Sequence, residues 1–236
     1  MPERFALYYA PPASHPIWPR AAQWLGRDPL GEPLPPAAIA GIEAGHRLEA
    51  CKSARRYGFH ATLKAPMALA PGTDRRALEA ELRRFSDETP MASIGRLRIA
   101  NLDGFLALIP EMQSDALTRL AGEIVTRFEP FRAPLGTSSR EKRIRDGRLT
   151  ERQIAYLDTY GYPYVLDEFR FHMTLTDRLS HAERPGLLAA ATAWFEPVLD
   201  EPFMLDRIAL FHETEAGAPF SRLADFPLLA RSTADA

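Results

Sequence analysis

A fold that mixes helices and strands in two similar lobes is predicted by three features of the sequence. The string aromatic, His, apolar, Thr, Leu occurs twice, as Phe59-His60-Ala61-Thr62-Leu63 and as Phe171-His172-Met173-Thr174-Leu175. The two histidines lie 112 residues apart (172 − 60), close to half of the 236-residue chain. Each copy is followed by patterns for a helix, a strand, a turn and a strand. The equal order of elements indicates an internal repeat on the scale of half the chain.

Local patterns place the elements around the first copy. Residues 4–10 are rich in strand formers. Residues 17–25 predict a short helix inside a stretch that has eight prolines between Pro11 and Pro36. Further along, the patterns predict a helix at 37–48, a helix at 77–87, strands at 91–100 and 104–109, and a helix that begins at Ser114 and ends before Pro130.

The second half begins with the least regular part of the chain, residues 132–165. Within it, only a helix from Thr150 is predicted, with Ile154 and Leu157 turned inward. After the second copy, the patterns predict a helix at 187–195 and a closing hairpin of residues 203–211 and 220–228. The whole chain, residues 1–236, is expected to form a single domain with two lobes.

Composition limits the class of protein. The chain is 46% hydrophobic and 25% charged, which is ordinary for a soluble globular protein. A net charge of −2 gives no overall attraction to nucleic acid or membrane, so an anion site must be local. The single cysteine, Cys51, excludes an intrachain disulfide and a thiolate zinc cluster. No signal peptide or membrane-spanning run is predicted, and the expected location is the cytoplasm.

Alternation along a strand predicts which motif side chains share a face. His60, Thr62 and Lys64 are expected on one face of the first motif strand, and Phe59 and Leu63 on the buried face. The second motif strand repeats this division, with Arg170, His172 and Thr174 on its polar face. Two such strands side by side would make a site with two histidines on a rigid support.

Two imidazoles suit the hydrolysis of a cyclic phosphodiester. Water attacks phosphorus opposite the departing alkoxide, so the reaction needs a base on one side and an acid on the other. Near neutral pH, one neutral and one protonated histidine can supply both, and the hydroxyls of Thr62 and Thr174 can donate to the phosphate oxygens. A zinc site needs a third ligand, and no nucleotide or nucleophile-elbow motif occurs. No metal and no cofactor are therefore expected.

Positive charges near the motifs are candidates for substrate binding. Lys64 and Arg170 share faces with the histidines, and Arg140 directly follows Thr137-Ser138-Ser139 in the basic segment 139–152. Arginine suits a two-pronged grip on phosphate, whereas lysine offers a point charge. The alternative is that Lys64 and Arg170 pair with acidic neighbours and that the basic segment is a solvated surface.

The paired motifs and the order of elements between them resemble the two-histidine (2H) phosphoesterase superfamily, which includes bacterial RNA 2′,3′-cyclic phosphodiesterases. Residues 55–66 and 135–140 resemble a branch often encoded beside phosphonate-breakdown genes. The resemblance implies a pseudo-twofold α+β fold with a mainly antiparallel sheet flanked by helices in each lobe and an active-site cleft between lobes. It implies catalytic roles for His60 and His172 and phosphate binding by Thr62 and Thr174.

Three possible functions remain open: two enzymes that differ in substrate class, and a module without catalytic activity. Residues 11–56 and 132–165 exceed what a compact RNA-end enzyme needs, which favours a small sugar or nucleotide cyclic phosphate, such as a phosphonate-pathway intermediate. An RNA-end 2′,3′-cyclic phosphodiesterase or ligase-like enzyme is the alternative. A non-catalytic module that binds a phosphorylated ligand is the third. The sequence leaves open the oligomeric state and which histidine is the base, and it predicts no membrane partner.

Overall fold

The computed structural model describes residues 3–34, 37–147 and 149–230, and its central feature is an antiparallel sheet of seven strands. The strand order is β4-β5-β6-β2-β1-β8-β9, and a smaller sheet pairs β3 with β7. The predicted α+β fold with antiparallel sheets is confirmed. The strands are β1 Arg4–Tyr9, β2 Ala61–Met67, β3 Ala92–Gly95, β4 Leu97–Leu102, β5 Phe105–Pro110, β6 Met173–Thr174, β7 Phe203–Leu205, β8 Arg207–Glu213 and β9 Ser221–Pro227.

The two halves of the chain exchange their hairpins. The hairpin β4–β5 follows the first motif in sequence, yet it pairs with β6 of the second motif. The hairpin β8–β9, which follows the second motif, extends the sheet from β1 beside β2. Strands β3 and β7 hold the same place in the two halves and pair with each other. The two halves of the chain are therefore joined in one sheet, with β2 and β6 as neighbours at the join.

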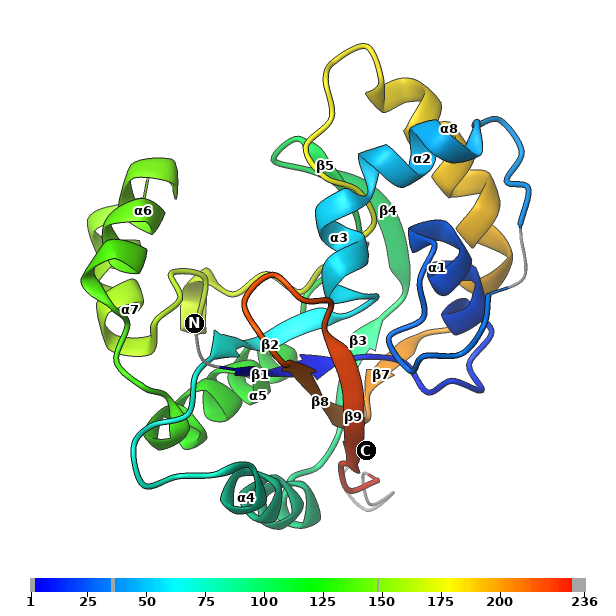
Figure 1. Cartoon of the computed structure of the whole chain (residues 1–236). Coiled ribbons are helices and arrows are strands. Elements are labelled where there is room, and N and C mark those ends of the chain that lie inside the picture. Colours follow the sequence, from blue (N-terminus) through cyan, green and yellow to red (C-terminus); the bar gives the residue numbers. More distant parts are fainter. Residues whose placement is uncertain (1–2, 35–36, 148, 231–236) are drawn as a thin grey trace.

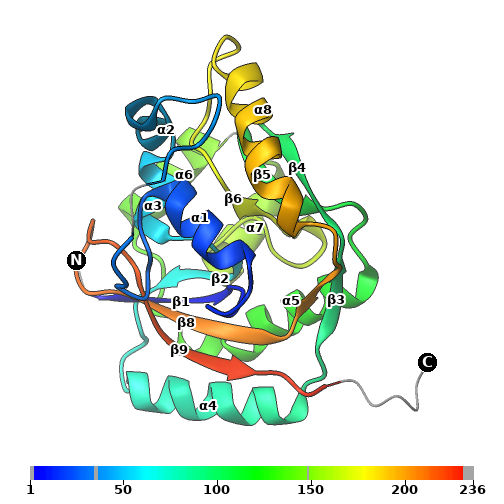
Figure 2. The same ribbon diagram turned by 90° about the vertical axis from the view of Figure 1, so that its right-hand side faces the viewer.

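Helices cover both sides of the sheet. In Figure 2, α4 lies below the strands β1, β2, β8 and β9, and α1 lies above them. Helix α5 contacts β2 and β3. In Figure 1, α6 and α7 form a pair that stands to one side of the sheet, away from α8. The helices are α1 Ile17–Leu25, α2 Ala44–Ala50, α3 Lys52–Tyr57, α4 Arg75–Glu88, α5 Asp115–Arg127, α6 Thr137–Gly147, α7 Glu151–Tyr160 and α8 Arg184–Phe195.

Side-chain caps fix the starts of three predicted helices. The carboxylate of Asp74 accepts from the backbone of the first turn of α4, and Ser114 does the same for α5. Thr150 and Gln153 form a capping box at α7, in which each side chain bonds the other residue's backbone. Such caps satisfy amides that have no partner inside the helix.

One predicted helix begins later than expected, and helices α3 and α6 were not predicted. The helix predicted at 37–48 begins only at Ala44. Helix α6 was not predicted, because its sequence carries Ile144 alone as a large apolar side chain and so lacks a helical stripe. Charged residues dominate α6, which is therefore held by its contact with α7 more than by an apolar face of its own.

The apolar faces of both motifs enter the core, as alternation predicts. Phe59, Leu63, Phe171 and Leu175 are all buried. Trp24 of α1 donates its indole N–H to the carbonyl oxygen of Leu175 at 2.9 Å, which ties the proline-rich excursion to the second motif. None of the helices in the described ranges is long and apolar enough to cross a bilayer.

Candidate active site

The two motif strands meet at their functional residues. Strands β2 and β6 are antiparallel neighbours, and Ala61 is the partner of Met173. In antiparallel pairing, the residues that flank such a pair also lie opposite each other. His60 therefore lies opposite Thr174, and Thr62 lies opposite His172. The predicted convergence of two imidazoles and two hydroxyls follows from this register.

Backbone carbonyls orient both imidazole rings in the same way. Nδ1 of His60 lies 2.9 Å from the carbonyl oxygen of Gly58, and Nδ1 of His172 lies 2.8 Å from that of Arg170. A carbonyl only accepts, so Nδ1 carries the proton in each ring. The lone pair of a neutral ring is then on Nε2, and in His60 this atom lies 3.3 Å from the hydroxyl of Thr62. Each histidine can thus accept or donate a proton through Nε2.

The surroundings of the two histidines differ. The His60 ring stacks on Tyr8 with 3.7 Å between ring centroids, whereas His172 has Phe105 at 5.8 Å. Burial, with a smaller contribution from the charge of His172, lowers the pKa of His60 to about 4. Burial also lowers the pKa of His172, with Arg170 acting in the same direction by charge. Both rings therefore favour the neutral form while no anion is bound.

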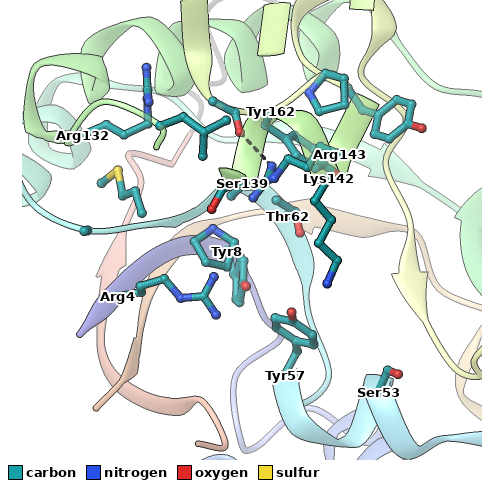
Figure 3. A pocket seen from close by; sticks show the side chains of 18 of the residues that line it. Arg4, Tyr8, Ser53, Tyr57, Thr62, Arg132, Ser139, Lys142, Arg143 and Tyr162 are labelled. Carbon is teal, nitrogen blue, oxygen red and sulfur yellow. Dashed lines mark hydrogen bonds between the residues drawn. The ribbon is translucent and has the colours of Figure 1, made fainter. Parts of the chain in front are cut away.

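A cavity of about 840 Å³ opens beside the motif residues. His60, Thr62 and Thr174 line it, together with Tyr8 and Tyr57, whereas His172 is not among its lining residues and reaches the site only through its place opposite Thr62. Its far wall is formed by α6, the segment 132–136 and the residues after α7. Figure 3 shows the side chains of this pocket, with Tyr8 and Tyr57 pointing into it.

The expectation that Lys64 shares a face with His60 is wrong, because β2 carries an extra residue. Leu7 pairs with Lys64 and Tyr8 pairs with Thr62, so Leu63 has no partner of its own in β1. Such a bulge reverses the alternation beyond it. The side chain of Lys64 is only 3% exposed, and its ammonium lies 2.8 Å from Glu129 and 3.0 Å from the carbonyl oxygen of Val125. Lys64 therefore belongs to the packing between β2 and α5.

Two predicted arginines lie outside the pocket lining. The side chain of Arg170 is 68% exposed and lies 3.9 Å from Asp103, although its charge acts on His172. Arg140 turns to α7, where its guanidinium contacts both carboxylate oxygens of Asp158 at 2.5 and 2.8 Å. The alternative that Lys64 and Arg170 pair with acidic neighbours describes their contacts, and Arg140 lies on the solvated side of the basic segment. Of the other predicted basic positions, Arg148 lies outside the described residues.

Sequence reasoning did not select several cations that line the pocket. Lys142 and Arg143 belong to the predicted basic segment but were not distinguished from Arg140, because α6 was not predicted. Arg4 of β1 and Arg132 also line the pocket. The signal for α6 was the spacing of Ser139, Lys142 and Arg143, which is i, i+3 and i+4 and so marks one face of a helix.

Arg4 is held by a buried carboxylate. Glu213 of β8 is fully buried and accepts from the Nε of Arg4 at 2.5 Å, from the guanidinium of Arg56 and from the backbone N–H of Gly217. Burial alone would raise the pKa of Glu213, but the hydrogen bonds from Arg4 and Arg56 lower it overall. This group joins β1, β8 and α3 at the edge of the pocket.

Among the side chains that the structure describes, no group of three or more His, Cys, Asp or Glu residues is placed to hold a metal ion.

Comparison with known proteins gives one family and several relatives. The family described as "Protein of unknown function (DUF1045)" matches residues 62–221. Two curated proteins named "Ribose 1,5-bisphosphate phosphokinase PhnN" are similar. The one from Janthinobacterium sp. (strain Marseille) is 38% identical over 222 residues, which are 92% of this chain and 49% of that protein. The one from Laribacter hongkongensis (strain HLHK9) is 37% identical over 219 residues, with 92% and 50% covered. The chain spans about half the length of these relatives.

Solved structures give more distant matches. The crystal structure of E. coli LigT complexed with 3'-AMP has a TM-score of 0.45 and 15% identity, with 97% of this chain and 99% of that chain covered. A crystal structure of a phosphoesterase has a TM-score of 0.44 and 13% identity, with 96% and 99% covered.

Proposed function

Because the chain belongs to the family described as a protein of unknown function (DUF1045), we propose its activity from the site: it is a two-histidine (2H) phosphoesterase that hydrolyses a cyclic phosphate ester without a metal. The observation that supports this most is the register of β2 and β6, which gathers two imidazoles and two threonine hydroxyls around the pair Ala61–Met173. Binding alone would not require two proton carriers in matched positions.

In the proposed reaction, the cyclic phosphate lies between the two histidines. One neutral Nε2 takes a proton from water as its oxygen bonds to phosphorus, and the other, protonated, gives its proton to the alkoxide oxygen as the phosphorus–oxygen bond breaks. The product is a noncyclic phosphomonoester with a free hydroxyl. Thr62 and Thr174 donate to the phosphate oxygens on which charge accumulates. The roles of the two histidines as base and acid are not assigned.

A small phosphorylated sugar or nucleotide is the proposed substrate class. A cavity of about 840 Å³ lies within the range usual for small-molecule sites. The relatives from Janthinobacterium and Laribacter carry a name that refers to ribose 1,5-bisphosphate, a sugar with two phosphates. Both points support a small substrate over an RNA end, and the relatives' name also supports a role in phosphonate metabolism.

The direct test is a panel of cyclic phosphates that includes sugar, nucleotide and RNA-end substrates. Phosphorus NMR should detect a noncyclic phosphomonoester from at least one small substrate, and exhaustive chelation should leave the rate unchanged. Faster cleavage of an RNA end would favour the RNA alternative. Tight binding of a substrate without turnover would favour a binding module, and a rate that needs an added metal would contradict the two-histidine mechanism.

The pH dependence should be bell-shaped, with its maximum in kcat/KM on the acidic side of pH 6.5. The active form has one neutral and one protonated histidine, and both pKa values in the free protein lie below the usual 6.5. A bound phosphate adds negative charge beside both rings and raises both pKa values. The maximum in kcat should therefore lie at a higher pH than that in kcat/KM. A kcat/KM that still rises above pH 7 would contradict the lowered pKa values of the two histidines.

A further inference from the structure

One face of α6 is turned to the pocket. Ser139, Lys142 and Arg143 are spaced as i, i+3 and i+4, and all three line the pocket. Arg140 points instead to α7 and pairs with Asp158. In Figure 3, the Lys142 side chain extends into the pocket. Helix α6 thus keeps one neutralised basic side chain outside the pocket and presents two others to it.

The two cations on the pocket face of α6 have no acidic partner among the described residues. The guanidinium of Arg143 donates to the carbonyl oxygen of Gly161 at 2.8 Å, which uses one of its five N–H groups. Arg143 is half-buried, and burial lowers its pKa, as do the charges of Arg4 and Arg132. A cation drawn out of water beside other cations is costly unless an anion joins it.

The neighbouring walls add positive charge. Arg4 and Arg132 each share one carboxylate with a second cation. Each of these two groups of three charged side chains therefore keeps one positive charge in excess. Among the described residues that line the pocket, Asp177 is the only acid, and its carboxylate accepts from the backbone at the start of α3. The two groups are Arg4–Glu213–Arg56 and Lys64–Glu129–Arg132.

We infer that Ser139, Lys142 and Arg143 bind a second anionic group of the substrate, a phosphate monoester remote from the cyclic phosphate. The inference rests on the proposed function, which assigns the cyclic phosphate to the motif histidines. Arg143 can grip a phosphate with two N–H groups, Lys142 adds a point charge, and the Ser139 hydroxyl can donate. The subsite would select substrates with two phosphorylated positions.

A matched pair of substrates tests the subsite. A nucleoside 2′,3′-cyclic phosphate and the same compound with a 5′-phosphate differ only in the remote anion. Arg143→Ala should raise KM for the 5′-phosphorylated compound by about 10- to 100-fold, the span expected for a lost charged hydrogen bond. It should change KM little for the other compound. Arg143→Lys, which keeps the charge, should give a smaller increase, and Arg140→Ala on the same helix should leave both values unchanged.

A binding measurement separates the subsite from the chemistry. Calorimetric titration with a nucleoside 5′-monophosphate needs no turnover, and Arg143→Ala should weaken it while Arg140→Ala should not. If no cyclic phosphate is hydrolysed but this contrast remains, the subsite stands and the proposed function fails. If Arg143→Ala and Arg140→Ala bind alike, or if Arg143→Ala affects both cyclic substrates equally, the subsite is overturned.

Discussion

The single variants His60→Ala and His172→Ala should each have a kcat on a cyclic phosphate that is lower by about 10²- to 10⁴-fold, the usual effect of removing a general acid or base. Each ring offers Nε2 to the site because its Nδ1 proton is used by a backbone carbonyl. The double variant should lose less than the product of the two single losses, because the remaining histidine has little to contribute without its partner.

The histidine variants need a control for general damage. His181 is exposed and belongs to neither motif, so His181→Ala should keep the activity of the unmodified protein. Circular dichroism should show that all variants are folded. Full activity in a folded His60→Ala or His172→Ala protein would end the two-histidine mechanism.

The second large effect is expected on stability, at Glu213. Glu213→Ala leaves the guanidiniums of Arg4 and Arg56 side by side without their shared carboxylate. Breaking a buried ion pair costs about 3 to 5 kcal/mol. The two arginine side chains are 27% and 31% exposed and can reach water, so we expect the lower end, about 3 kcal/mol. Urea denaturation would measure this loss in the free energy of unfolding.

Glu79 offers a matched control for Glu213. Its carboxylate is 18% exposed and also contacts two arginines of α4, Arg75 at 2.6 Å and Arg83 at 3.3 Å, whose side chains are 51% and 60% exposed. Exposed ion pairs contribute about 1 kcal/mol or less. Glu79→Ala should therefore cost far less than Glu213→Ala. Equal losses in the two variants would show that burial of the Glu213 carboxylate has no special effect.

The sequence was sufficient to predict those structural properties that depend only on neighbouring residues in the chain. Alternation predicted the buried aromatic faces of both motifs, and the caps at Asp74, Ser114 and Thr150 marked helix starts that the structure has. The convergence of His60 and His172 was also predicted, because a repeated motif on paired strands brings the copies together.

The errors arise where a property depends on distant parts of the chain. Alternation failed at Lys64 because the bulge at Leu63 is defined by pairing with β1, which the local pattern does not contain. Arg140 was preferred over Arg143 because the direction of each side chain depends on a helix with no apolar stripe. The exchange of hairpins was also not predicted, because the sequence of a strand does not determine which other strand it pairs with.

The exchange of hairpins bears on how a two-motif chain could arise from a one-motif ancestor. A chain of half this length, with one motif and one hairpin, could place its hairpin in the sheet of the other motif only as a pair of identical chains related by a twofold axis. Donor and acceptor would then be the same residue in the same surroundings. Joining the halves in one chain removes that constraint, and the Tyr8 ring on His60 against the Phe105 ring near His172 is the kind of inequality that only a fused chain can encode.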